Sequence, residues 1–167
     1  MIVTAEQSSI IDQYFRQKGC EYWKEQEPAY GLIDFKERTV IIVGADCGTT
    51  VLFSLINGAK HIIAYEKDAN LRAKLVDILS DAKVSSDIVD IRGEWIGEYP
   101  EGNIFIQYCE GCELINDFNQ IAKYEQSCIA LHMWIDVTKL LPHFRGYTVT
   151  YVTPDSKEVV LCKLPNT

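Results

Sequence analysis

The feature that most restricts the fold is a regular alternation of short apolar runs and amphipathic segments from residue 38 onward. Residues 40–43 are β-branched and apolar on both faces, as a strand covered by helices on each side must be. Further strands are expected at residues 61–66, 87–92, 103–108 and 127–133. Helical patterns are expected at residues 49–56, 69–79 and 113–123. Asp136 could cap a further short helix through Phe144, although Pro142 lies inside it. Alternating strands and helices predict a mostly parallel sheet.

The carboxyl-terminal part of the chain breaks this alternation. Two β-rich runs, residues 147–152 and 158–164, are separated by only residues 153–157. So short a connection suits a hairpin and is too short for a parallel crossover. The sequence therefore predicts a Rossmann-like three-layer α/β sandwich with a mostly parallel seven-stranded sheet. Its last strand should be antiparallel and lie next to residues 127–133.

The first 37 residues have a helical character of their own. Thr4 and Gln7 have the spacing of a capping box, and Gly19 stands where the helix would stop. A weaker helical segment over residues 20–27 should end at Pro28, before a loop. We expect one domain over residues 1–167, with a helical appendage (1–37) and a core (38–167).

The charge balance excludes some partners. The chain has 16 Lys and Arg against 24 Asp and Glu, a net charge of −8, which argues against generic binding to nucleic-acid phosphates or anionic membranes. No apolar run approaches the roughly 20 residues of a membrane span, and residues 1–7 lack the layout of a signal peptide. We expect a cytoplasmic protein.

The six cysteines are expected to be mostly small buried hydrophobic residues, because a core of this size needs no disulfide framework. They are Cys20, Cys47, Cys109, Cys112, Cys128 and Cys162. Cys109 and Cys112 alone have ligand spacing, and no second pair completes four zinc ligands. We expect no metal site.

The turn after residues 40–43 is the segment most suited to ligand binding. Gly44 and Gly48 lie between a strand and a helix, where they allow a tight turn and a close approach to the backbone. Thr49 or Thr50 could cap the helix that follows. A dinucleotide fingerprint would also need glycine at positions 46 and 49, which are Asp46 and Thr49.

The end of the next strand supplies an acid. Glu66 follows Gly44 by 22 residues, about where a carboxylate accepts hydrogen bonds from both ribose hydroxyls of an adenosine group. The alternative interpretation is that Glu66 is a solvated carboxylate at the end of a strand. With Gly44 and Gly48, Glu66 favours an adenosine-containing ligand. The absent pyrophosphate glycine then favours S-adenosylmethionine over a dinucleotide.

With these motifs, the chain from about residue 38 to 164 resembles class I S-adenosylmethionine-dependent methyltransferases. It is most similar to the FkbM-type family, through Gly44-Ala45, Ala64-Tyr65-Glu66, Glu110-Gly111-Cys112-Glu113 and His132. The resemblance implies O-directed methyl transfer to an acceptor, which we expect to be a small molecule. Two positions depart from the family pattern, because Ile42 and Tyr108 stand where the family has acids.

The donor-side candidates each have a second interpretation. Asp46 could cap the following helix or approach the donor's ammonium group. Glu94 and Trp95 lie where methyltransferases contact adenine, but Trp95 could equally be a half-buried surface aromatic. Tyr108 could place its ring near the sulfonium or simply pack.

The catalytic candidates are Glu110 and His132. Glu110 and Glu113 could share a helical face, or could only stabilise the start of a helix. His132 ends a strand beside the expected cleft and suits a general base for a hydroxyl nucleophile, although a satisfied core histidine is the alternative. His61 and His143 have no such placement.

The sequence thus favours a methyltransferase that uses S-adenosylmethionine. The alternative is a catalytically degenerate methyltransferase-fold module with a binding or regulatory role, which Ile42 and Tyr108 would favour. A nicotinamide oxidoreductase is a more distant third.

Overall fold

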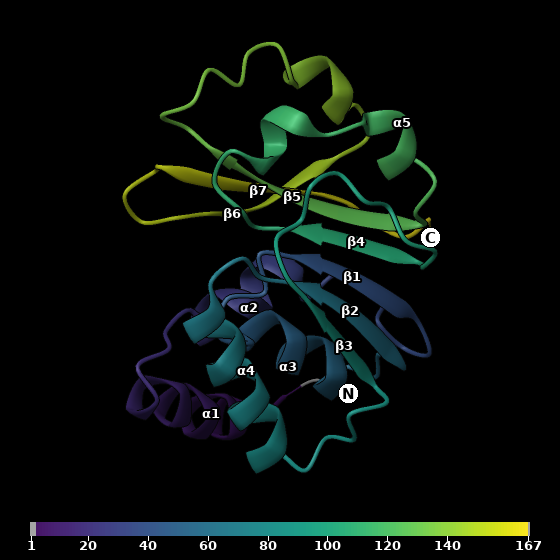
Figure 1. Cartoon of the computed structure of the whole chain (residues 1–167). Coiled ribbons are helices and arrows are strands. Elements are labelled where there is room, and N and C mark those ends of the chain that lie inside the picture. Colours follow the sequence, from purple (N-terminus) through teal and green to yellow (C-terminus); the bar gives the residue numbers. More distant parts are fainter. Residues whose placement is uncertain (1–2, 167) are drawn as a thin grey trace.

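The computed structural model describes residues 3–166 and contains one seven-stranded sheet in the order β3-β2-β1-β4-β5-β7-β6 (Figure 1). The strands are β1 (Thr39–Val43), β2 (His61–Tyr65), β3 (Val89–Arg92), β4 (Ile104–Gln107), β5 (Gln126–His132), β6 (Thr148–Val152) and β7 (Glu158–Lys163). Strands β1 to β5 are parallel, and β7 is antiparallel to both β5 and β6. The predicted fold class is confirmed, including the position of the last strand.

Helices cover both faces of the sheet, which explains why β1 is apolar on both sides. They are α1 (Ala5–Gln17), α2 (Trp23–Tyr30), α3 (Thr49–Ile56), α4 (Ala69–Asp81) and α5 (Phe118–Ile121), with the short 3-10 helices η1 (Cys112–Ile115) and η2 (Leu141–Phe144). Val40 and Ile42 join a core with α1 to α4, whereas Ile41 and Val43 join a second core with α5 and η2. Figure 1 shows these two helical layers on either side of the sheet.

Local signals set several of the element boundaries. The predicted capping box is present, because the Thr4 hydroxyl accepts from the Gln7 amide and the Gln7 side chain accepts from the Thr4 amide. Helix α4 begins where the Asp68 carboxylate accepts from the first amides of the helix. Helix α3 begins at Gly48 in the left-handed conformation, and neither Thr49 nor Thr50 provides a side-chain cap.

Three of the predicted helical segments are wrong in detail. The expected helix at residues 113–123 is divided into η1 and α5, because Asn116 leaves the helical conformation and Asp117 caps a new helix. Helix α2 extends to Tyr30 with Pro28 inside it, instead of ending at the proline. The expected helix around residue 137 is reduced to η2, which has Pro142 in its first turn.

Most of the cysteines are buried, as expected, but the expectation that they form no disulfides is wrong. All six form disulfides, which join Cys20 to Cys47, Cys109 to Cys112 and Cys128 to Cys162. Cys128 and Cys162 lie opposite each other on β5 and β7, so the fold itself brings them together. A large core makes disulfides unnecessary for folding, but it does not prevent cysteines that become neighbours from pairing.

None of the helices within residues 3–166 combines the length and hydropathy that a bilayer crossing demands.

Candidate functional site

A cavity of about 570 Å³ opens at the carboxyl ends of the parallel strands. This volume is within the range of small-molecule sites, and this edge of a doubly wound sheet is where such folds bind ligands. Of the nine residues that the sequence singled out, eight line the cavity: Gly44, Asp46, Glu66, Glu94, Trp95, Tyr108, Glu110 and His132. The ninth, Gly48, does not.

The turn after β1 places backbone, without a side chain, against the cavity. Gly44 has φ +83°, and the amides of Gly44 and Ala45 both donate to the Tyr65 carbonyl, at 3.0 and 2.9 Å. A Cβ atom at position 44 would collide with the backbone carbonyl of Tyr108. Gly44 therefore lets the β1 and β4 ends approach each other, and an added side chain would disturb that edge of the cavity.

We expect Gly44→Ala to lower the free energy of unfolding by at least about 1–2 kcal/mol, the cost of holding a non-glycine residue at this backbone conformation. The collision with Tyr108 adds to this cost. Gly93→Ala is the matched control, since nothing lies within 4 Å of its added Cβ. Urea unfolding of the two variants measures the difference, and equal midpoints would contradict the assignment.

Gly48 has a packing role in place of the expected cofactor contact. It has φ +106°, and a Cβ atom there would come within 2.5 Å of the Leu75 side chain of α4. Glycine at this position thus allows α3 to begin close to α4.

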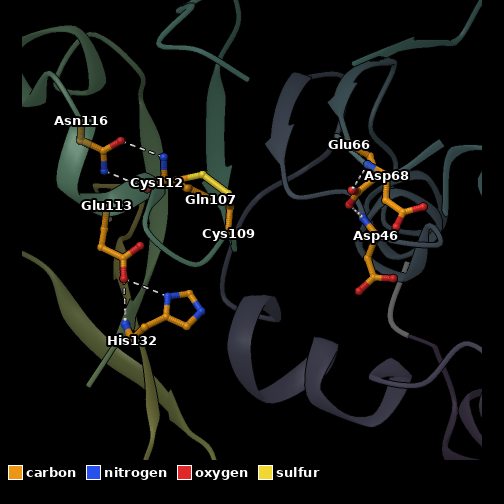
Figure 2. Close-up of a disulfide and its surroundings, with 9 residues drawn as sticks. All are labelled: Asp46, Glu66, Asp68, Gln107, Cys109, Cys112, Glu113, Asn116 and His132. Carbon is orange, nitrogen blue, oxygen red and sulfur yellow. Dashed lines mark hydrogen bonds and ion pairs between the residues drawn. A yellow bond between two sulfur atoms is a disulfide. The ribbon is translucent and has the colours of Figure 1, made fainter. Parts of the chain in front are cut away.

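Glu66 organises the floor of the cavity. Its Oε1 accepts from the Asp46 amide at 2.8 Å and its Oε2 from the Asp68 amide at 2.9 Å (Figure 2). The side chain is buried and also lines the cavity. Because each carboxylate oxygen can accept more than one hydrogen bond, these two contacts leave capacity for a ligand hydroxyl.

Asp46 lies beside Glu66 in a left-handed conformation, with φ +52°. Its Oδ1 accepts from the amide of the next residue, Cys47, at 2.7 Å. Burial raises the pKa of Asp46, and that amide partly opposes the effect. Asp46 does not cap α3, so its carboxylate remains on the cavity wall.

Trp95, the aromatic residue after β3, is more deeply buried than an adenine-contacting residue or a half-buried surface aromatic was expected to be. Trp95 is 5% exposed, its Nε1 donates to the Glu98 carbonyl at 2.7 Å, and its ring packs edge-on against Tyr99. The neighbouring Glu94 is exposed and lines the cavity. Trp95 is therefore held rigidly by the core where it borders the cavity.

The two departures from the family pattern occupy different environments. Ile42 is 1% exposed in the core and does not line the cavity, so an acid there would be buried among apolar side chains. Tyr108 does line the cavity, and its ring meets that of His132 edge-on at 6.0 Å between centroids.

His132 and Glu113 form a buried pair at the end of β5. Glu113 Oε1 lies 2.8 Å from His132 Nδ1 and also accepts from the His132 amide at 3.0 Å (Figure 2). Burial alone would raise the pKa of Glu113, but the hydrogen bonds from His132 hold it below its usual value. An ionised Glu113 accepts the proton of Nδ1, so in the neutral form of His132 the lone pair lies on Nε2. Nε2 lies 3.8 Å from Glu158 Oε1.

Glu113 is a functional candidate that sequence reasoning missed. It was expected at the start of a helix beside Glu110, whereas it is fully buried and Glu110 is exposed. Gln107 and Asn116 exchange two amide hydrogen bonds, at 2.7 and 2.8 Å, and so tie the end of η1 to β4. Glu110 instead accepts from Trp134 Nε1 at 2.8 Å.

Another wall of the cavity is formed by two segments for which the sequence predicted no functional role. Helix α2 contributes Glu25, Gln26 and Tyr30, and the β6–β7 hairpin contributes Tyr151 and Glu158. No sequence signal links these two segments, which lie more than a hundred residues apart. The Thr150 hydroxyl, which donates to the Ala29 carbonyl at 2.8 Å, holds them together.

Charge is distributed unevenly around the cavity. Seven carboxylates line it: Glu25, Asp46, Glu66, Asp68, Glu94, Glu110 and Glu158. Among residues 3–166, Lys67 is the only lysine or arginine on the wall. Within that same range, no group of three or more His, Cys, Asp or Glu side chains is arranged to hold a metal ion.

Solved structures of methyltransferases share this fold at low sequence identity. The chain matches a dimethyladenosine transferase from Plasmodium falciparum with a TM-score of 0.62 and 14% identity, over 86% of this chain and 61% of that one. It matches the ribosomal protein L11 methylase of Lactobacillus delbrueckii subsp. bulgaricus with a TM-score of 0.61 and 11% identity, over 86% and 79%. Streptococcus pneumoniae Sp1610, a candidate tRNA (m1A22) methyltransferase crystallised with S-adenosyl-L-methionine, gives 0.60 and 13%, over 87% and 74%. The fold is that of class I S-adenosylmethionine-dependent methyltransferases.

Sequence comparison identifies much nearer relatives, although no family model matches the chain. It is 42% identical over 156 residues to Uncharacterized protein 65 of Sulfolobus islandicus filamentous virus (isolate Iceland/Hveragerdi), covering 93% of this chain and 98% of that protein. It is 41% identical over 156 residues to Uncharacterized protein 158B of Sulfolobus islandicus rod-shaped virus 1, covering 92% and 99%. The chain therefore belongs to the family of these two viral proteins.

Proposed function

We propose that the protein is an S-adenosylmethionine-dependent methyltransferase. The observation that carries the proposal is that one cavity contains both a donor-type half and a proton acceptor. Gly44 and Glu66 form the first half, at the ends of β1 and β2, and the His132–Glu113 pair borders the other. Figure 2 shows Glu66 on one side of the view and the His132–Glu113 pair on the other.

The residues present suit this donor. Gly44 allows close approach to the backbone, and the buried Glu66 carboxylate is a charged acceptor suited to ribose hydroxyls. Asp46 and Tyr108 border the same cavity, where a carboxylate and an aromatic ring favour positive charge. When bound, S-adenosylmethionine would supply the methyl group for a direct displacement.

The protein's own part in such a reaction is alignment and proton transfer. The cavity would hold the acceptor nucleophile against the methyl carbon, which lowers the entropic barrier. His132 would accept the acceptor's proton at Nε2, and Glu113 would stabilise the imidazolium through Nδ1. We also propose a catalytic role for Glu110, an FkbM-type relationship and a cytoplasmic location; the FkbM-type pattern implies O-directed transfer to a small-molecule acceptor.

Calorimetric titration of the purified protein with S-adenosylmethionine, and separately with NAD⁺, tests the proposal. We expect saturable binding of the first and none of the second, because Asp46 and Thr49 replace the dinucleotide glycines. Absence of S-adenosylmethionine binding would refute the proposed function. Binding without transfer to any acceptor would favour the degenerate module.

We expect Glu66→Ala to weaken S-adenosylmethionine binding about 10- to 150-fold, which corresponds to about 1.5–3 kcal/mol for a charged hydrogen bond. It should also lower stability, because the Asp46 and Asp68 amides lose their acceptor. Calorimetry and urea unfolding separate the two effects, with the exposed Glu21→Ala as a charge-matched control. Lower stability with unchanged affinity would restrict Glu66 to supporting the turn.

A further inference from the structure

The part of the cavity wall formed by α2 and the β6–β7 hairpin combines acidic and aromatic side chains. Glu25 of α2 and Glu158 of β7 line it together with Tyr30 and Tyr151. Among residues 3–166, neither carboxylate forms an ion pair with a lysine or arginine. Both acids are partly buried, and within the described part of the chain the one ion-pair contact of either is that of Glu158 with His132.

The two carboxylates also influence each other. The pKa of Glu25 is raised by burial and next by the charge of Glu158, while the Tyr151 hydroxyl partly opposes the shift. Burial likewise raises the pKa of Glu158. Partly buried like charges of this kind destabilise each other, and a bound cation would relieve the repulsion.

A second feature of the same wall points to a ligand that donates hydrogen bonds. Gln26 is 4% exposed and lines the cavity. Its Nε2 donates to the Tyr22 carbonyl at 3.1 Å, but its Oε1 has no hydrogen-bond partner among residues 3–166. A buried amide oxygen without a partner costs about 1–3 kcal/mol, so a donor from a ligand would stabilise it.

From these contacts we propose that the methyl acceptor is a cationic aliphatic amine, held by Glu25 and Glu158 and methylated on nitrogen. The inference rests on the proposed methyltransferase function and replaces the hydroxyl acceptor implied by the family resemblance. Tyr30 and Tyr151 add aromatic rings beside the carboxylates, which favour an ammonium group. A phosphate-bearing acceptor would be repelled by the same wall.

The position of Glu158 connects capture of the cation with its deprotonation. Glu158 Oε1 lies 3.8 Å from His132 Nε2, so an ammonium group on Glu158 reaches the free lone pair of His132. The carboxylates oppose loss of this proton and the positive charge of the donor's sulfonium favours it, so His132 must take the proton directly from the bound ammonium group. The carboxylates of this wall then stabilise the positive charge that remains in the cavity.

Proton loss comes first and methyl transfer second. The ammonium group gives one proton to His132 Nε2 and becomes a neutral amine. Its nitrogen lone pair forms the bond to the methyl carbon while the carbon–sulfur bond breaks, and that electron pair remains on sulfur. The products are S-adenosylhomocysteine, a methylammonium group and a protonated His132, which returns its proton to water.

The first test compares small probes on the full-length protein loaded with S-adenosylhomocysteine. We expect butylammonium to bind at least tenfold more tightly than its neutral counterpart butanol, as measured by ligand-observed NMR titration. Glu158→Gln and Glu25→Gln should each weaken butylammonium binding about 10- to 100-fold, the loss expected for a charge-assisted hydrogen bond. Glu21→Gln changes the same charge outside the cavity and should have no effect. Equal binding of butylammonium and butanol would overturn the inference.

The second test measures methyl transfer and distinguishes two sources of amine. Spermidine and a lysine-containing peptide are each incubated with protein and S-adenosylmethionine, beside counterparts in which every amine is acetylated. We expect a 14 Da increase in at least one amine and in neither acetylated form. Transfer to RNA or to a hydroxyl compound, or to no amine at all, would overturn the inference. Absence of S-adenosylmethionine binding would instead refute the proposed function itself.

Discussion

Reduction of the disulfides should lower the melting temperature of the protein by roughly 15 to 30 °C. Cys20–Cys47 spans 27 residues and Cys128–Cys162 spans 34. Closing loops of these lengths restricts the unfolded chain and stabilises the fold by about 3–4 kcal/mol each. Each kcal/mol corresponds to about 2–4 °C in a protein of this size. Thermal unfolding followed by circular dichroism, with and without reductant, measures the change.

The third disulfide provides an internal control for this experiment. Cys109 and Cys112 are only 3 residues apart, so their link restricts the unfolded chain far less. The double variant Cys109→Ala/Cys112→Ala should have a melting temperature close to that of the wild type. Reductant should lower the melting temperature of this variant by nearly as much as that of the wild type. If reductant leaves the wild-type melting temperature unchanged, the two long-range disulfides contribute nothing to stability.

Replacing His132 should produce the largest loss of activity. We expect His132→Ala to lower kcat about 100- to 10,000-fold, the usual contribution of a general base, with little change in S-adenosylmethionine affinity. The exposed His143 lies outside the cavity, and His143→Ala should retain activity. Transfer rates and calorimetry on both variants check this expectation.

Stability must be separated from catalysis in this variant, because Glu113 would become a buried charge without a partner. That situation costs about 3–5 kcal/mol. The double variant His132→Ala/Glu113→Gln removes the charge and should recover most of the stability without recovering activity. Recovery of both would show that His132 is a structural residue and would contradict its role as a base.

The parts of the fold that the sequence predicted correctly depend on local signals. The Thr4–Gln7 capping box, the glycine turn at residue 44 and the short connection before β7 are each encoded within a few residues. The carboxyl ends of parallel strands meet at one edge, so strand assignments alone were enough to bring Gly44, Glu66 and His132 to one cavity.

The features that the sequence did not predict depend on long-range contacts. Glu113 had the pattern of a helix-start acid, but Asn116 leaves the helical conformation and pairs with Gln107, and Glu113 contacts His132. Glu25 and Glu158 are 133 residues apart and become neighbours only when α2 packs on β6. Gly48 was predicted to bind a ligand because a turn glycine gives the same signal whether it faces a ligand or a helix such as α4.

The position of β7 between β5 and β6 has a consequence for how the protein is made. Strand β6 pairs with β7 and with no other strand of the described sheet, so β6 cannot join the sheet until β7 has been made. During synthesis, the strands from β1 to β5 can assemble in order, whereas the hairpin and Glu158 can join only when translation passes residue 163. A nascent chain halted before that point would have the donor half of the cavity without the wall that faces α2.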